Sequence, residues 1–348
     1  MQPHRERFAA GEIQAVLSHY DLGTIESARE LPRGSRRAPK LLLRTTHGLY
    51  LLKRRAAGRD NPERVAFSHE LTNVLRGRGF PVPRLVGTRA ENHSLLRLDD
   101  RVYEIFEFVD GADYGGSLDQ TMSAGATLAA FHRAARDVHT EWKPPETGYH
   151  DLPSVRNGLN AIPSTTAGHD SVIGREAELL SLTQQLYECY DAHVAAIEAA
   201  GYAGWPRGIV HGDWHPGNLL YEHARVVAVL DLDSARRLPY VCDVANGMLQ
   251  FSMVRGGDEP ANWPDYADEA RMRRFWLGYL HVTPRFPIEQ RRAIPELMME
   301  SLIAESVVPI AATGSFGPIP GFGVLQMVRR KLRWLENARE RLLGWLLE

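Results

Sequence analysis

The sequence predicts an α+β fold in which a small antiparallel sheet precedes a larger, mainly helical region. Runs of strand-forming residues separated by turn residues are concentrated before residue 110. After Gly111, apolar residues recur at helical spacing over most of the chain. At 348 residues the chain is also longer than one typical domain. We therefore expect two lobes, residues 1–110 and residues 111–348, with a hinge near residue 110.

The first lobe is expected to hold a sheet and one clear helix. Residues 41–43 and 49–52 form two apolar runs separated by a turn, which predicts a strand, a turn and a strand. Period-two alternation places Lys53 at the end of one face of the second strand. Asn61 and Pro62 are a typical helix start, and the apolar stripe after them predicts a helix to about residue 76. The remaining elements expected here are a helix at 12–20 and strands at 95–98 and 103–109.

The second lobe is expected to be a set of helices around one group of short strands at 206–233. The helical patterns cover residues 123–136, 175–200, 240–255, 266–280, 289–306 and 324–347. The last pattern repeats leucine at three and four spacing, which fits packing onto the lobe or a coiled-coil dimer. A monomer and a homodimer therefore both remain open.

Composition excludes several classes of protein. With 44% hydrophobic and 24% charged residues the chain is typical of a globular protein, and its net charge of −2 argues against non-specific nucleic-acid binding. Two distant cysteines, Cys189 and Cys242, fit a reducing compartment. The first eleven residues are polar, and no run of about eighteen apolar residues occurs. We therefore expect a cytoplasmic protein that neither spans nor binds a membrane.

The segment from His211 to Asp233 carries the densest set of candidate functional side chains. It contains His-x-Asp at His211 and Asp213, Asn218 five residues after that aspartate, and Asp231 thirteen residues further on. Phosphoryl transfer needs these types: an aspartate to accept a hydrogen bond from the attacking hydroxyl, and an asparagine and a second aspartate to hold Mg²⁺, which prefers oxygen ligands. A lysine must also hold the nucleotide phosphates, and Lys53 lies upstream.

This chain resembles the superfamily of aminoglycoside phosphotransferases, choline kinases and type II homoserine kinases, which are small-molecule kinases with a protein-kinase-like, bilobal fold. The resemblance covers roughly residues 25–250. It is carried by the His211 to Asn218 block and by flanking segments at 50–53, 80–83, 128–132 and 229–233, together with Glu70. It implies an ATP-dependent enzyme that uses Mg²⁺ and a small hydroxyl acceptor, such as an amino alcohol, a homoserine-like compound, a sugar or an aminoglycoside.

The same resemblance implies a role for each matching residue. Asp213 is expected to act as the catalytic base or hydroxyl-orienting group, Asn218 and Asp231 as Mg²⁺ ligands, and His211 as a scaffold residue. Nucleotide binding is assigned to Lys53 on the α and β phosphates, Glu70 as the partner of Lys53, Gly34 and Ser35 in the phosphate loop, and backbone groups at Glu107, Phe108 and Val109 near adenine. Asp233 is expected to support the metal site.

One segment departs from the family pattern. The loop at 31–40 has one glycine and four basic residues, Arg33, Arg36, Arg37 and Lys40, where the family usually has more glycine and asparagine. These side chains fit two interpretations: direct charge pairing with phosphate, or a solvated turn.

Three other functions are compatible with parts of this pattern. His211, Asp213 and His215 offer ligands for Zn²⁺ in a metallohydrolase, but that interpretation leaves Asn218 and Asp231 unexplained. An atypical protein Ser/Thr kinase is the main alternative; the chain lacks the Ala-Pro-Glu tripeptide that ends the activation segment of protein kinases. A nucleotide-binding protein without transfer activity is the third.

Overall fold

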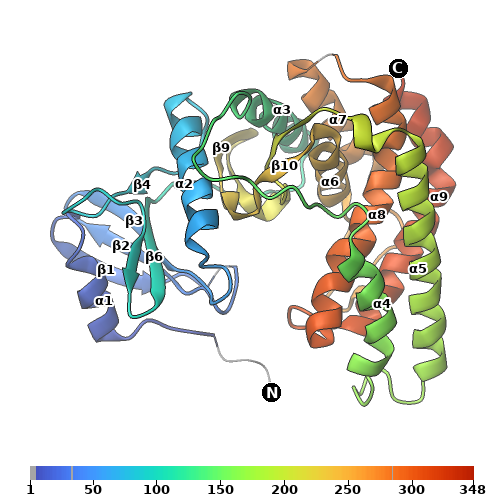
Figure 1. The fold of residues 1–348 in the computed structure, drawn as a ribbon, viewed down its shortest axis with the longest axis horizontal. Helices are drawn as coiled ribbons and strands as arrows, with labels where there is room; N and C mark the ends of the chain where they lie inside the picture. Colours follow the sequence, from blue (N-terminus) through green and yellow to red (C-terminus); the bar gives the residue numbers. More distant parts are fainter. Residues whose placement is uncertain (1–4, 33, 284) are drawn as a thin grey trace.

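The computed structural model describes residues 5–32, 34–283 and 285–348 (Figure 1). Within these residues, a six-stranded antiparallel sheet forms the N-terminal part in the order β1-β2-β3-β6-β4, with β5 paired to β6. Helices and small hairpins form the rest, and they lie to one side of the sheet in Figure 1. This arrangement confirms the predicted α+β class. The division of the chain at residue 110 stays a prediction.

The sheet-containing part has two helices, one before the sheet and one between its third and fourth strands. Its elements are α1 (Ala10–Leu17), β1 (Ile25–Glu30), β2 (Lys40–Thr45), β3 (Gly48–Arg54), α2 (Pro62–Gly77), β4 (Leu85–Val86), β5 (Leu96–Leu98) and β6 (Arg101–Glu107). The strand β1 was not predicted from the sequence, because none of its six residues is buried and it carries no apolar alternation.

The helical part contains α3 (Leu118–Ala134), α4 (Pro153–Thr165), α5 (Glu176–Ala199), α6 (Tyr240–Ser252), α7 (Glu269–Val282), α8 (Ile288–Thr313) and α9 (Gly321–Leu346). Its strands form three two-stranded sheets, which pair β7 (Arg207–Val210) with β10 (Arg236–Pro239), β8 (Leu219–Glu222) with β9 (Arg225–Val229), and β11 (Ser315–Phe316) with β12 (Ile319–Pro320). Short 3-10 turns are η1 (Tyr202–Gly204), η2 (Pro216–Asn218), η3 (Leu232–Ser234) and η4 (Pro260–Asn262). Among the described helices, none is long and apolar enough to cross a lipid bilayer.

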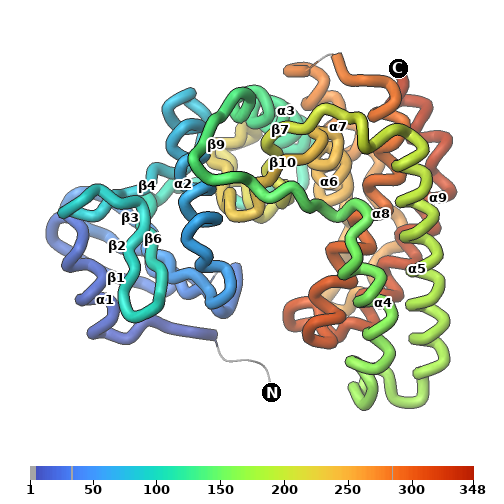
Figure 2. The backbone as a smooth tube through the Cα atoms, in the orientation of Figure 1, coloured from blue at the N-terminus to red at the C-terminus, as the bar shows by residue number. Residues whose placement is uncertain are grey.

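The helix α4 was not predicted from the sequence. It contains Gly158 and Pro163, which lower helix propensity and break the pattern. It forms nevertheless, because Val155, Leu159 and Ile162 are buried in the larger core. A long segment without regular structure connects α3 to α4, and Figure 2 shows it running across the face of the helical part.

Two hydrophobic cores lie on either side of α2. The smaller core, which includes Leu43 and Ile105, fills the space between the sheet and α1. The larger core fills the helical part and also takes in Phe67, Leu71 and Leu75, the apolar stripe of α2. The apolar stripe of α2 therefore packs into the helical part, while His69 of the same helix contacts β6 of the sheet.

The helices α3 and α7 pack closely because each contributes a glycine at the point where they cross. A Cβ atom on Gly125 would overlap the carbonyl oxygen of Phe275, and one on Gly278 would overlap the carbonyl oxygen of Met122. Helix backbones can approach this closely only where no side chain separates them. The pair fixes α3 against α7, and α3 in turn contacts β7 and β9 of the central hairpins.

We predict that Gly125→Ala lowers the free energy of unfolding by about 2 kcal/mol or more, because the new methyl group meets backbone atoms that have no room to move. Chemical denaturation measures this change. The control is Gly344→Ala in α9, where a Cβ atom meets nothing within 4 Å. That variant should be more stable by about 0.5–1 kcal/mol, because alanine favours the helix. Equal effects at the two positions would contradict the packing described here.

Candidate functional site

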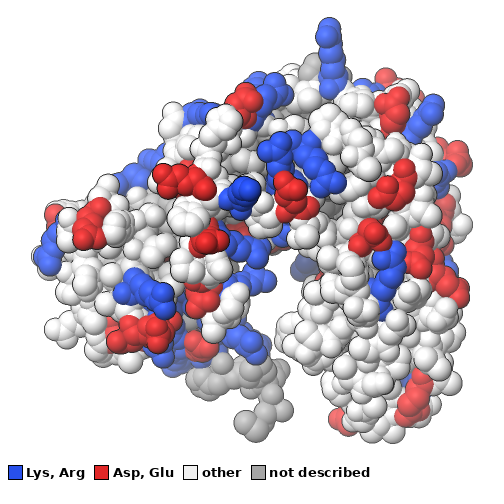
Figure 3. All heavy atoms as spheres, in the orientation of Figure 1, with Lys and Arg blue, Asp and Glu red and all other residues white. Residues whose placement is uncertain are grey.

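A cavity of about 470 Å³ lies between the sheet and the central hairpins. Figure 3 shows a deep hollow between the sheet-containing part and the column of helices beside it. Most of the predicted site residues line this cavity, namely Gly34, Lys53, Glu107, Phe108, Val109, Asp213, Asn218 and Asp231. Two predicted residues, Ser35 and Glu70, are not among the lining residues. The fold therefore brings together side chains that are distant in the sequence.

Lys53 lies in a buried network of charges rather than in a single ion pair. Its Nζ atom is 3.0 Å from Glu104 Oε1 and 3.2 Å from Asp233 Oδ2. Arg55 donates to the same two carboxylates, with Nη2 at 2.9 Å from Glu104 Oε2 and 2.6 Å from Asp233 Oδ1. Lys53 and Glu104 are direct cross-strand partners of β3 and β6, so the sheet itself sets their separation.

The balance of charge keeps all members of this network ionised. Burial alone would lower the pKa of Lys53, but the carboxylates of Glu104, Asp233 and Asp231 outweigh it and hold this pKa above its ordinary value. Burial alone would raise the pKa of Glu104, yet Lys53 and Arg55 hold it well below its usual range. A buried carboxylate of this kind is stable only while its cationic partners are present.

Glu70 was predicted as the partner of Lys53, and that prediction is wrong. The α2 residue that faces the network is the preceding one, His69, whose Nε2 atom is 2.8 Å from Glu104 Oε2. Because consecutive helical residues point about 100° apart, Glu70 faces elsewhere. Its Oε2 atom accepts a hydrogen bond of 3.3 Å from the backbone nitrogen of Glu141. An acidic residue inside the apolar run of β6 was the sequence signal for Glu104, since a charge there needs a buried partner.

The loop that carries Asp213 is held by a buried aspartate that the sequence analysis missed. Asp243 on α6 accepts hydrogen bonds from the backbone nitrogens of His211 (2.6 Å) and Gly212 (2.9 Å). His132 on α3 supports Asp243, with Nε2 at 3.1 Å from its Oδ2 atom. Gly212 has a φ of 75°, and a Cβ there would overlap the backbone oxygen of Ser234, so no other residue fits.

The side chain of His211 lies inside the protein and contacts the segment that precedes Asp231. Its Nε2 atom donates to the carbonyl oxygen of Leu230 at 3.1 Å, which ties the loop to the residue after β9. The ring also lies edge-on to Trp214 and to Phe131, both fully buried. Trp214 is therefore a core residue and does not face the cavity.

Asp213 is held in its ionised form beside Asn218 and His215. Asn218 Nδ2 donates to the backbone oxygen of Asp213 (3.0 Å) and to its Oδ2 atom (3.3 Å), and His215 Nε2 is 3.7 Å from its Oδ1 atom. Burial acts to raise the pKa of Asp213, but His215 and Asn218 outweigh it, and the pKa lies below its ordinary value. The carboxylate is thus an acceptor of hydrogen bonds at neutral pH.

The β8–β9 hairpin brings Asn218 and Asp231 together. Asn218 directly precedes β8, Asp231 closely follows β9, and the backbone nitrogen of Leu230 donates to the carbonyl oxygen of Asn218 at 2.8 Å. Asp231 adopts the left-handed region with φ of 61° and is exposed towards the cavity. Because Asn218 uses its amide nitrogen on Asp213, its Oδ1 atom is the one that can meet a cation. An amide oxygen and a carboxylate are ligands that fit Mg²⁺.

The predicted nucleotide segments divide into those that reach the cavity and those that do not. The backbone nitrogens of Glu107 and Phe108 already donate to Arg84 (2.8 Å) and Leu49 (2.9 Å), and the Glu107 carboxylate pairs with Arg84 at 2.6 Å. The groups that remain to bind a nucleotide base here are the carbonyl oxygens of Glu107 and Phe108 and the residue Val109. Ser35 is engaged in its own turn, where its Oγ atom accepts from the backbone nitrogen of Arg37 at 3.2 Å.

The basic loop has one side chain at the cavity. Lys40 lines it beside Gly34, whereas Arg36 and Arg37 are not among its lining residues. Arg33 lies outside the described residues. Among the described basic residues of this loop, Lys40 is therefore the one placed for charge pairing with phosphate, and the solvated-turn interpretation fits Arg36 and Arg37.

The chain is similar in sequence and in fold to several known kinases. A homoserine kinase from Burkholderia thailandensis is 29% identical over 218 residues, which cover 61% of this chain and 59% of that protein. The chain therefore spans less than two thirds of that relative's length. The structure of a microcompartment-associated aminopropanol kinase matches with a TM-score of 0.72 at 16% identity, covering 96% of this chain and 98% of that one. An amicoumacin kinase in complex with AMP-PNP and Ca²⁺ matches with a TM-score of 0.68 at 12% identity, covering 95% and 94%.

These structural matches confirm the bilobal, kinase-like fold. At the level of sequence, residues 28–277 match the phosphotransferase enzyme family. The matched region begins in the first strand of the sheet, includes the loop of Asp213 and the β8–β9 hairpin, and ends in α7. The chain belongs to the phosphotransferase enzyme family.

Proposed function

We propose that this protein transfers the γ-phosphoryl group of ATP to a hydroxyl group of a small metabolite. The observation that carries the proposal is that Lys53, Asp213, Asn218 and Asp231 line one cavity between the sheet and the helical part. Their side chains are the types that phosphoryl transfer needs, and all four lie at the wall of this cavity.

Lys53 is the residue proposed to hold the phosphates. The buried carboxylates of Glu104 and Asp233 fix its ammonium group at the floor of the cavity and keep it charged. A positioned point charge of this kind stabilises the negative charge of the transferring group without further reorganisation. Mg²⁺, held by Asn218 and Asp231, would neutralise phosphate charge that Lys53 does not reach.

Asp213 is proposed to orient the acceptor. Its ionised carboxylate would accept a hydrogen bond from the attacking hydroxyl, whose oxygen then forms a bond to the γ-phosphorus as the bond to the bridging oxygen of ADP breaks. The hydroxyl proton passes towards Asp213 as that bond forms. Since the pKa of Asp213 is lowered, orientation of the hydroxyl is its main contribution before the transition state.

The region after Asp231 supports a small acceptor over a polypeptide. Only η3 and β10 separate Asp231 from α6, which begins at Tyr240. The strand β10 is paired along its length with β7. A protein substrate would need an extended surface at this place, and the structure fills it with a short paired strand.

We predict that Asp213→Ala lowers kcat by about 100-fold or more, because the hydroxyl loses the group that orients it. The KM for ATP should change little, since Lys53 and its partners are intact. Transfer of label from ATP to the small solutes of a cell extract measures the activity. The exposed Asp21→Ala variant serves as the control. Unchanged transfer by the Asp213 variant would refute its assignment, and label in protein bands instead of solutes would favour a protein kinase.

We predict that Glu104→Gln weakens nucleotide binding and lowers the free energy of unfolding by about 3 kcal/mol, because Lys53 and Arg55 lose a buried counter-charge. Chemical denaturation and the KM for ATP measure the two effects. Glu70→Gln is the matched control and should change stability by no more than about 0.5 kcal/mol. A larger effect of Glu70→Gln than of Glu104→Gln on stability and on the KM for ATP would identify Glu70 as the partner of Lys53.

A further inference from the structure

The chain before α1 lies against the loop that follows β1. The backbone nitrogen of Glu6 donates to the carbonyl oxygen of Arg36 at 2.9 Å. The guanidinium group of Arg5 donates to the carbonyl oxygens of Gly34 and Ser35 at 3.5 and 3.4 Å. Three consecutive carbonyl groups of this loop therefore accept hydrogen bonds from two neighbouring residues near the start of the chain.

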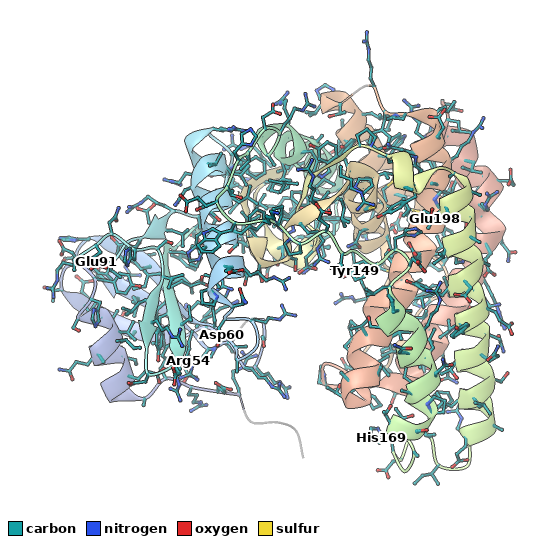
Figure 4. The ribbon with its side chains drawn as sticks, in the orientation of Figure 1. Arg54, Asp60, Glu91, Tyr149, His169 and Glu198 are labelled. Carbon is teal, nitrogen blue, oxygen red and sulfur yellow. The ribbon has the colours of Figure 1, made fainter. Side chains whose placement is uncertain are left out.

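The chain before α1 also binds the strand that carries Lys53. Because side chains alternate along a strand, Lys53 faces the cavity and Arg54 faces the opposite side of the sheet. Arg54 donates from Nη2 to Glu6 Oε2 and from Nη1 to Glu12 Oε1, each at 2.6 Å. Its guanidinium carbon lies 5.3 Å from the centre of the Phe8 ring. Figure 4 labels Arg54, which lies close to α1 in the sheet-containing part.

Glu6 thus connects two parts of the nucleotide site through one residue. Its backbone nitrogen holds the loop after β1, and its carboxylate holds the residue next to Lys53. The Arg54 side chain is almost fully buried and is also fixed by Glu12, which accepts from the Tyr103 hydroxyl at 2.8 Å. The Glu6 carboxylate is half exposed, so its ion pair adds little to stability. The effect of this contact therefore falls on the position of the loop.

The carbonyl contacts determine where the loop directs its amide groups. In a planar trans peptide the N–H group points away from the preceding carbonyl oxygen. The carbonyl oxygens of Gly34 and Ser35 point towards Arg5, so the N–H groups of Ser35 and Arg36 point away from it. Among the residues that the structure describes, neither of these N–H groups has a hydrogen-bond partner. Successive N–H groups on one side of a loop form a site for anions, and Gly34 and Lys40 on either side of them line the nucleotide cavity.

We infer that Glu6 is a positioning residue for the nucleotide phosphates, because it holds the loop after β1 in the shape that presents the N–H groups of Ser35 and Arg36. Glu6 itself touches no substrate. The loop has a single glycine between residues 31 and 40, so its shape depends on contacts from outside more than on backbone freedom. This inference rests on the proposed function and deepens it, because it assigns the chain before α1 to the phosphate side of the site.

Nucleotide binding to two variants of Glu6 tests this role. Glu6→Ala removes the carboxylate that reaches Arg54, and Glu6→Pro removes the N–H group that holds the loop. Titration calorimetry with Mg²⁺ should show that Glu6→Ala binds ATP about 10-fold more weakly, the factor expected for the loss of a hydrogen bond between charged groups. Glu6→Pro should weaken ATP binding as well. Adenosine, which has no phosphate, should bind the variants and the wild-type protein equally. Glu26→Ala, an exposed position of β1, is the control.

Two further measurements separate positioning from a merely structural role. The melting temperature of Glu6→Ala should stay close to that of Glu26→Ala, because the ion pair of Glu6 is half exposed. Amide hydrogen exchange at residues 34–36 should become faster in both Glu6 variants, while exchange in β3 stays unchanged. A structural residue would instead lower the melting temperature and weaken the binding of ATP and adenosine alike.

The outcomes distinguish this inference from the proposed function. Unchanged ATP affinity in both Glu6 variants, or equal weakening of ATP and adenosine, would overturn the inference and leave the kinase assignment standing. If the wild-type protein binds no ATP and transfers no label to any solute, the proposed function itself fails, and the inference fails with it.

Discussion

The buried charge network around Glu104 is the interaction that joins the two parts of this molecule. Lys53 belongs to β3 and Arg55 follows that strand directly. Glu104 belongs to β6 and His69 to α2, whereas Asp233 belongs to η3 in the helical part. Two cations and two carboxylates thus share one desolvated volume across the boundary. Buried charges are costly to separate, because removal of one partner leaves another unbalanced in a medium of low polarity. This network also restricts the position of Asp231, because only Leu232 separates Asp231 from Asp233.

A second network of buried polar groups supports the loop that carries Asp213. Asp243 receives two backbone N–H groups of the loop that carries Asp213, and the His132 and Tyr279 side chains extend this chain of contacts to α3 and α7. The close crossing of α3 and α7 at Gly125 and Gly278 is therefore connected to the catalytic loop through hydrogen bonds. Two sets of buried polar contacts, one around Lys53 and one around the loop that carries Asp213, hold the residues of the cavity in place.

The sequence predicted the residues that line the cavity better than the contacts that support them. Asp213, Asn218 and Asp231 follow one another at short spacing, so the β8–β9 hairpin could be expected to bring them together. Glu104 and Asp243 act across long separations, and each looks like an isolated acid in an apolar stretch until the fold is known. Glu70 lies on the predicted helix, but its neighbour His69 is the residue that meets the network. Consecutive residues of a helix point about 100° apart, so a difference of one position changes which side chain faces Glu104.

The packing of α2 has a consequence for how activity could be controlled. In protein kinases, displacement of the equivalent helix can break the ion pair of the phosphate-binding lysine and switch the enzyme off. Here the carboxylate partner of Lys53 lies on the neighbouring strand, and Phe67 and Leu71 anchor α2 in the larger core. Outward movement of α2 would expose both side chains at about 1.5–3 kcal/mol each and would still leave Lys53 paired with Glu104. A displacement of α2 alone would therefore leave the ion pair of Lys53 intact, unlike the corresponding displacement in protein kinases.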